Sequence, residues 1–120
     1  MSFAWKVFAV ALLAALAWAD APGAEAQPPI RIGATLSQTG AYAVQGRNQL
    51  RGYQLCVKHM NDKGGALERK LELVVYDDGS DPATAVRLYE KLITQNKVDL
   101  VLGPFSSPIT DAVANVPPTP

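Results

Sequence analysis

Two adjacent serines, Ser106 and Ser107, are the residues of this 120-residue chain best placed to do chemistry. They stand in VLGPFSSPITDA, between an apolar segment typical of a strand end and a pattern typical of a helix start. Because free backbone N–H groups lie at the start of a helix, hydroxyls there favour an anion such as a carboxylate. Serine is also a common helix cap, so the pattern leaves both roles open for the pair.

Of the two serines, we expect Ser107 to bind the ligand. Pro108 follows it, and because proline favours the first helical turn, Ser107 should be the N-cap and present its hydroxyl beside the free N–H groups. Ser106 would then lie in the extended link and point away or touch its neighbours. Tyr42 and Gln45, in the polar segment after the first apolar run, are weaker candidates that face either a ligand or solvent.

The sequence gives little support for catalysis or metal binding. A serine nucleophile favours Gly-x-Ser-x-Gly, and the segment from Gly103 lacks the second glycine. The only histidine, His59, falls in a helical pattern and off its apolar side, which argues against a Ser-His-Asp triad. DDGSD at 77–81 lacks the glycine at position six and the glutamate at position twelve of a calcium loop, and indicates a turn that ends in a cap at Asp81. We predict no catalytic residue, no metal ligand and no cofactor.

Apolar periodicity predicts three strands that alternate with three helices. The strands are expected at 30–36, 70–77 and 98–102, and the helices run to about Lys63, from Pro82 and from Pro108. Gly64 should end the first helix. Its core-facing side is expected to consist of Leu50, Tyr53, Cys56, Val57 and Met60.

This alternation predicts an α/β fold with a parallel sheet and crossover helices. We interpret it as the incomplete N-terminal half of a doubly wound lobe, βαβαβα, with strand order 2-1-3. In such a sheet a ligand binds at the carboxyl ends of the strands, where the strand order reverses. The segments 37–46 and 103–108 should therefore meet at the site.

The ends of the chain predict export. Residues 7–19, VFAVALLAALAWA, are free of charge and small residues follow at Ala24 and Ala26, which is typical of a secretory signal peptide. We expect residues 1–26 to be this signal peptide, with cleavage after Ala26 or alternatively after Ala19. Residues 27–116 would form the partial lobe in the periplasm, and 117–120 a truncated, proline-rich end.

Charge and cysteine content narrow the partners. Eleven basic and eleven acidic residues balance, with no basic stripe, which argues against nucleic acid. Cys56 is the only cysteine, so no intramolecular disulfide can form, and we expect it to be a small core residue.

Four blocks of the sequence together resemble a known family. They are IRIGATLSQTGAYAVQG, GYQLCVKHMNDKGG, KLELVVYDDGSDPATAV and VDLVLGPFSSPITDAVA, and they cover about residues 30–116. In this order they are similar to the start of the periplasmic ligand-binding proteins of branched-chain-type amino acid ABC transporters, a leucine-binding-protein-like group with the type I periplasmic binding fold.

The resemblance implies two α/β lobes that close on a small ligand and deliver it to a membrane permease, without a cofactor. It implies that the Ser107 hydroxyl meets the α-carboxylate of an amino acid. Gln45 stands where leucine-type binders place a tryptophan, so an aliphatic ligand is not implied. Ser80 and Ser106 stand where some members have a disulfide pair.

Three functions remain open from the sequence. The first is the solute-binding component of an ABC transporter, which takes up an amino acid or similar small carboxylate. The second is a ligand-sensing receptor domain of the same fold, and the third is an exported α/β hydrolase. Because a cleft ligand needs both walls, we expect the 120-residue chain not to be a competent binder by itself.

Overall fold

The computed structural model describes residues 26–117. The expected signal peptide lies outside the described residues except for Ala26, and so does all of the proline-rich end but Pro117. Within residues 26–117, no helix combines the length and the apolar character needed to cross a bilayer.

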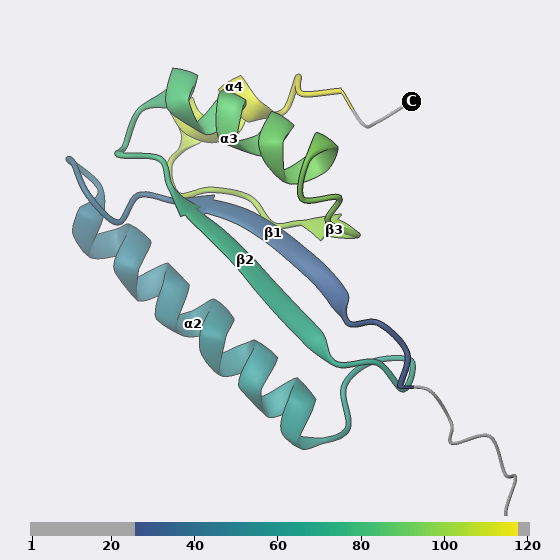
Figure 1. The fold of residues 1–120 in the computed structure, drawn as a ribbon. Helices are drawn as coiled ribbons and strands as arrows, with labels where there is room; N and C mark the ends of the chain where they lie inside the picture. Colours follow the sequence, from purple (N-terminus) through teal and green to yellow (C-terminus); the bar gives the residue numbers. More distant parts are fainter. Residues whose placement is uncertain (1–25, 118–120) are drawn as a thin grey trace, which may run out of the picture.

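Three strands and three helices alternate along the described chain, as predicted (Figure 1). The strands are parallel and lie in the order β2-β1-β3, which confirms the expected α/β topology. In chain order, the elements are β1 (Ile30–Leu36), α2 (Ala43–Asp62), β2 (Leu71–Asp77), α3 (Pro82–Thr94), β3 (Leu100–Val101) and α4 (Ser107–Val113).

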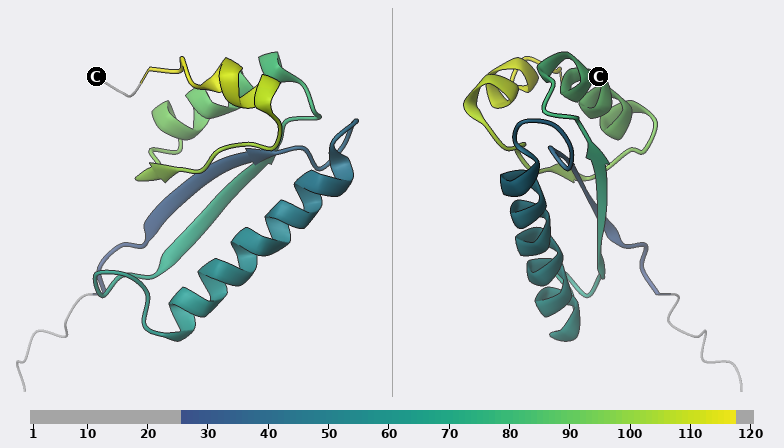
Figure 2. Two further views of the ribbon diagram at one scale, coloured as in Figure 1. Left: turned by 180° about the vertical axis from the view of Figure 1, so that it is seen from behind. Right: turned by 90° about the vertical axis from the view of Figure 1, so that its left-hand side faces the viewer.

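The helices cover both faces of the sheet. Helix α2 packs on β1 and β2 from one side, whereas α3 packs on β1 from the other and carries α4 beside it (Figure 2). All three strands run in one direction, so their carboxyl ends, and the loops that follow them, lie at the same edge.

The central strand β1 forms the core with both helix layers. Gly33 lies so close to α3 that an added Cβ would stand 3.1 Å from the Leu92 side chain. Because side chains alternate along a strand, Ala34 and Leu36 point to the opposite layer, and both are fully buried. Glycine at position 33 thus lets α3 approach the sheet.

The ends of α2 and α3 follow ordinary capping chemistry. The Asp81 side chain accepts a hydrogen bond from Thr84 N at 2.7 Å, and Pro82 occupies the first helical position, as predicted. At the end of α2, Gly65 N donates to Met60 O and Gly64 N donates to Asn61 O. With both glycines at positive φ, this is the Schellman arrangement.

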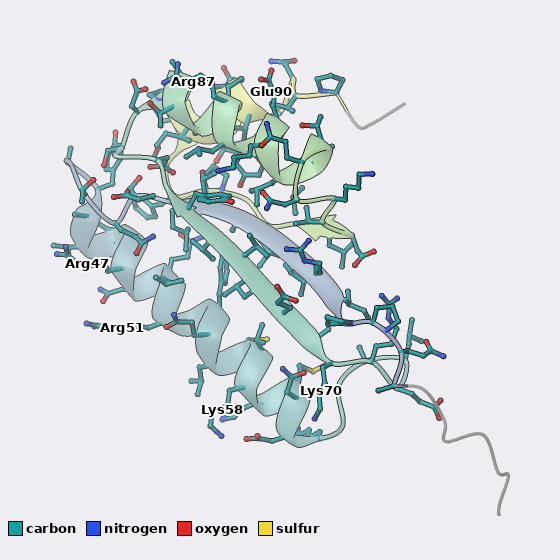
Figure 3. The ribbon with its side chains drawn as sticks, in the orientation of Figure 1. Arg47, Arg51, Lys58, Lys70, Arg87 and Glu90 are labelled. Atoms are coloured by element: carbon teal, nitrogen blue, oxygen red, sulfur yellow. The ribbon has the colours of Figure 1, made fainter. Side chains whose placement is uncertain are left out.

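The predicted core-facing side of α2 is partly wrong. Cys56 is exposed, and Met60 keeps 37% of its surface exposed. Among the described elements α2 packs mainly on β1 and β2, and this contact leaves Cys56 and part of Met60 at the surface. The outer side of the helix is charged, and Arg47 and Lys58 project away from the sheet (Figure 3).

Strand β3 is shorter than the expected 98–102, because only Leu100 and Val101 pair as a strand. The flanking backbone still bonds to β1: Asp99 N donates to Arg31 O and Leu102 N to Gly33 O, both at 2.8 Å. The chain therefore leaves the sheet at Leu102 with its position fixed by β1.

Two glycines of α2 should respond oppositely to alanine. A Cβ on Gly46 would lie 2.0 Å from Ser37 O, whereas nothing lies within 4 Å of one on Gly52. Gly46→Ala should lower the free energy of unfolding by about 1 to 3 kcal/mol through overpacking. Gly52→Ala should raise it by up to about 1 kcal/mol through helix propensity. Urea unfolding measures both; equal effects would contradict the close approach of α2 to the end of β1.

Candidate functional site

The buried carboxylate of Asp78 organises the carboxyl edge of the sheet. It is fully buried and accepts hydrogen bonds from Thr35 Oγ1 at 2.9 Å, Ser37 Oγ at 2.6 Å and Ser80 N at 2.9 Å. Hydrogen bonds to an ionised carboxylate are stronger than those between neutral groups. Asp78 thereby joins the end of β1 to the loop that follows β2.

Asp77 binds the same two loops from the solvent side. Its carboxylate accepts from Gln38 N, Thr39 N, Thr39 Oγ1 and Gly79 N, at 2.8 to 3.2 Å. Burial acts to raise the pKa of Asp77, but these four hydrogen bonds outweigh it and hold the pKa below its ordinary value of 3.8. The loop after β1 is therefore held by an anion that stays charged into acid.

Ser80 and Tyr42 extend this network to the last loop. Ser80 Oγ donates to Thr39 O at 2.8 Å and accepts from Tyr42 N at 3.0 Å. The Tyr42 ring then meets the Phe105 ring, with centroids 5.7 Å apart and planes inclined by 59°, a favourable tilted geometry. The loops after β1 and β3 therefore meet, as the strand order predicted.

The serine corner, which we define as residues 102–107, begins α4 differently from the prediction. Ser106, not Ser107, is the N-cap: Ser106 Oγ accepts from Ile109 N at 3.5 Å, and Ser106 O accepts from Thr110 N and Thr110 Oγ1. Ser107 is the first helical residue. The expectation that Ser106 lies in an extended link is also wrong, because its φ is 82° and its ψ 142°.

The position of Pro108 explains this correction. In the structure Pro108 is the second helical residue. The N–H groups of the first turn have no partner within the helix, so proline loses nothing at the second position either. Proline therefore marks the first turn of α4 without fixing which serine precedes it.

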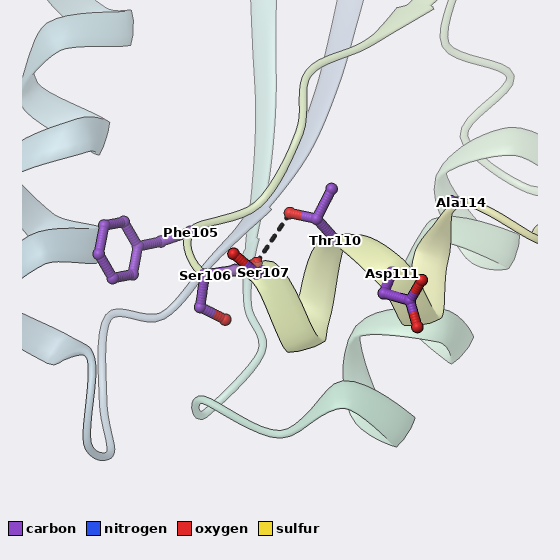
Figure 4. Close-up of a pocket in the computed structure, with 6 residues that line it drawn as sticks. All are labelled: Phe105, Ser106, Ser107, Thr110, Asp111 and Ala114. Carbon is purple, nitrogen blue, oxygen red and sulfur yellow. Dashed lines mark hydrogen bonds between the residues drawn. The ribbon is translucent and has the colours of Figure 1, made fainter.

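A shallow, open pocket lies along α4 at this corner (Figure 4). It is lined by Phe105, Ser106, Ser107, Thr110, Asp111 and Ala114. Ser107 is exposed there, and within residues 26–117 its hydroxyl makes no hydrogen bond to the protein. The pocket thus combines a free hydroxyl, an aromatic ring and one carboxylate.

Of the four predicted binding residues, the structure brings three together. Ser106 and Ser107 line the pocket, and Tyr42 contacts its Phe105 wall. Gln45 is exposed on the first turn of α2 and does not line the pocket. The sequence prediction omitted Thr110 and Asp111. Their spacing of three and four residues from Ser107, which places them on one helix face, could have identified them.

Comparisons with known proteins agree with this fold. The family profile described as "Periplasmic binding protein" matches residues 29–117. The Leu/Ile/Val-binding protein homolog 1 of Brucella abortus is 31% identical over 107 residues, which cover 89% of this chain and 28% of that protein. The Leu/Ile/Val-binding protein of Escherichia coli is 31% identical over 72% of this chain and 23% of its own length.

Solved structures show the same relationship. The branched-chain amino acid transporter substrate binding protein LivJ of Streptococcus pneumoniae, in complex with isoleucine, is 35% identical with a TM-score of 0.69. The match covers 71% of this chain and 24% of that one. The fatty acid ABC transporter substrate-binding protein of Thermomonospora curvata is 33% identical with a TM-score of 0.61, over 72% of this chain and 22% of that one.

The fold is that of part of one lobe of an α/β binding protein. The chain belongs to the periplasmic binding protein family, and it spans about a quarter of the length of the curated relatives it matches. These relatives are named as binding proteins and not as enzymes, which agrees with the prediction of a non-enzyme and removes support from the hydrolase alternative.

The two serines should respond oppositely to the same pair of substitutions. Ser106→Ala should lower the free energy of unfolding by about 1 kcal/mol through loss of the cap. Ser106→Gly should be at least as stable as Ser106→Ala, because glycine accepts the positive φ and a glycine cap costs only a few tenths of a kcal/mol. At Ser107, a helical position, the alanine variant should instead have the higher free energy of unfolding, by up to about 1 kcal/mol. Urea unfolding of the four variants measures these free energies. An alanine variant more stable than the glycine variant at both positions would contradict Ser106 as the cap.

Proposed function

We propose that this chain forms one wall of the ligand cleft of an ABC transporter substrate-binding protein, and that the serine corner receives a carboxylate of the ligand. The observation that carries the proposal is the Ser107 hydroxyl. It is exposed in the pocket and makes no hydrogen bond to the protein within residues 26–117, so its donor is free. A hydrogen bond from this donor to a charged carboxylate is stronger than one to a neutral group.

The names of the relatives support a carboxylate as the shared chemistry. The Streptococcus pneumoniae protein holds isoleucine, and the Thermomonospora curvata protein is named for fatty acids. Isoleucine and a fatty acid differ in size and in their charged groups, but both carry a carboxylate.

Asp111 favours an amino acid over a simple carboxylate. Its side chain lines the same pocket, one helical turn from Ser107. An anion without a compensating positive charge would be repelled by this carboxylate, whereas a zwitterion can place its ammonium group towards it. We therefore infer an amino acid or a similar small molecule that carries both charges.

A role in transport would also explain the predicted export and the predicted membrane partner. We infer that the chain is exported to the periplasm by removal of residues 1–26 and that its protein partner is a membrane permease, as the family membership supports. N-terminal sequencing of periplasmic protein should begin at Gln27, or at Asp20 if the alternative site is cut. A periplasmic chain that still begins at Met1 would contradict the export prediction.

Titration of the isotopically labelled chain tests the carboxylate site. With one wall present we expect binding in the millimolar range, about 4 kcal/mol, because a pocket normally encloses most of its ligand. L-isoleucine should shift the backbone NMR signals of Phe105, Ser107 and Thr110, and its methyl ester should do so much less. Saturable micromolar binding, measured by calorimetry, would contradict the expectation that both walls are needed.

A pair of variants makes this test specific. Ser107→Ala should weaken isoleucine binding by roughly 1 to 3 kcal/mol, the scale of a hydrogen bond to a charged group. Thr94→Val, which removes an exposed hydroxyl from the end of α3, is the matched control and should bind as the parent chain does. Equal shifts with isoleucine and its ester, or no effect of Ser107→Ala, would place the site elsewhere.

A further inference from the structure

Two consecutive carbonyl groups of the serine corner are held from opposite faces of the sheet. The Tyr89 hydroxyl, on α3, donates to Leu102 O. The Tyr53 hydroxyl, on α2, donates to Gly103 O at 3.1 Å. Helices α2 and α3 lie on opposite faces of the sheet (Figure 2). The corner is therefore held between two tyrosines just before α4 begins.

Gln49 determines the direction of the Tyr53 hydroxyl. Its side-chain Nε2 donates to Tyr53 Oη at 2.6 Å and reaches Gly103 O at 3.4 Å. Because the Tyr53 oxygen accepts from this amide, its own proton is left to point at Gly103 O. Gln49 and Tyr53 are one helical turn apart on α2, which places them side by side.

The two tyrosines differ in what else they contribute. Tyr89 is a core residue with 4% of its surface exposed, and burial raises its pKa to about 12. Tyr53 is half-buried; its bond to Gly103 O lies at the exposed surface, and the bond that it accepts from Gln49 is partly buried. Within residues 26–117, Gly103 is the one hydrogen-bond partner of the Tyr53 hydroxyl outside α2.

The serine corner needs such support because Ser106 is strained. Its φ of 82° lies in the region that favours glycine, and such conformations persist only where the surroundings hold them. Thr110 and Ile109 hold the exit of the corner through Ser106. The entry is held at Leu102 and Gly103.

We propose that Tyr53, directed by Gln49, is a positioning residue for the serine corner. Its bond to Gly103 O keeps Ser106 in the positive-φ conformation and Ser107 turned into the pocket. This inference rests on the proposed carboxylate site for its functional consequence. The side chain does not touch the ligand. It acts through the backbone between Gly103 and Ser107.

Tyr53→Phe in the full chain tests the proposal, since it removes one hydroxyl and leaves the ring. Isoleucine binding, followed by NMR at Ser107, should weaken about threefold to tenfold, the factor that one neutral hydrogen bond carries. Tyr76→Phe is the matched control, because its hydroxyl bonds Asn96 Oδ1 and not the corner. It should leave binding unchanged.

Gln49→Leu keeps the proposal testable through a second residue. If Gln49 directs Tyr53, this variant should weaken binding by part of the same factor. The double variant with Tyr53→Phe should lose less than the product of the two single effects, as residues acting through one bond do. Full multiplicativity of the two losses would overturn the role of Gln49.

A measurement without ligand separates this inference from the proposed function. In Tyr53→Phe the amide hydrogens of Ile109 and Thr110, which bond to Ser106, should exchange faster, while protection in β1 and α3 stays as in Tyr76→Phe. Unchanged exchange at the corner, or a uniform loss of protection everywhere, would overturn the positioning role. If the parent chain shows no carboxylate binding but this local change occurs, the proposed function fails and the positioning of the corner stands.

Discussion

The carboxylates of Asp77 and Asp78 are the groups on which the carboxyl edge of this sheet depends. Together they accept seven hydrogen bonds, six from the loops after β1 and β2 and one from Thr35 near the end of β1. A buried carboxylate is costly unless it is well satisfied, and within residues 26–117 no buried side-chain nitrogen or oxygen lacks a partner. The pair thereby joins the two loops at one edge of the sheet.

Further contacts connect this edge to the serine corner. Ser80 Oγ accepts a hydrogen bond from Tyr42 N, and the Tyr42 ring packs against Phe105 in the pocket wall. Tyr53 and Tyr89 hold the corner from the two faces of the sheet. The strained backbone of Ser106 is stable because these contacts act together, which is common where a binding group must be held in one direction.

Local patterns in the sequence predicted most of the fold. Periodicity located the strands and helices, and Asp81 with Pro82 marked the start of α3, because these signals act within one helical turn. The exposure of Cys56 was not predictable from the sequence, because it depends on which part of α2 packs against the sheet.

The site was predictable in place but not in detail. The strand order placed the two loops together. Which serine is the N-cap, however, depends on the positive φ of Ser106, and a serine in the sequence does not indicate a positive φ. The bonds of Asp77 to Thr39 and of Tyr53 to Gly103 join residues 38 and 50 positions apart. No local pattern carries such pairs.

Titration of the Asp77 carboxyl, followed by carbon NMR, tests the central role of the carboxylate pair most directly. The midpoint should fall below the ordinary pKa of 3.8, because hydrogen bonds in the folded chain stabilise the charged form. The amide signals of Gln38, Thr39 and Tyr42 should move with the same midpoint, since the loop after β1 loses its anchor as Asp77 is protonated. A midpoint at or above 3.8, or a titration that leaves the Thr39 and Tyr42 signals unmoved, would contradict the account.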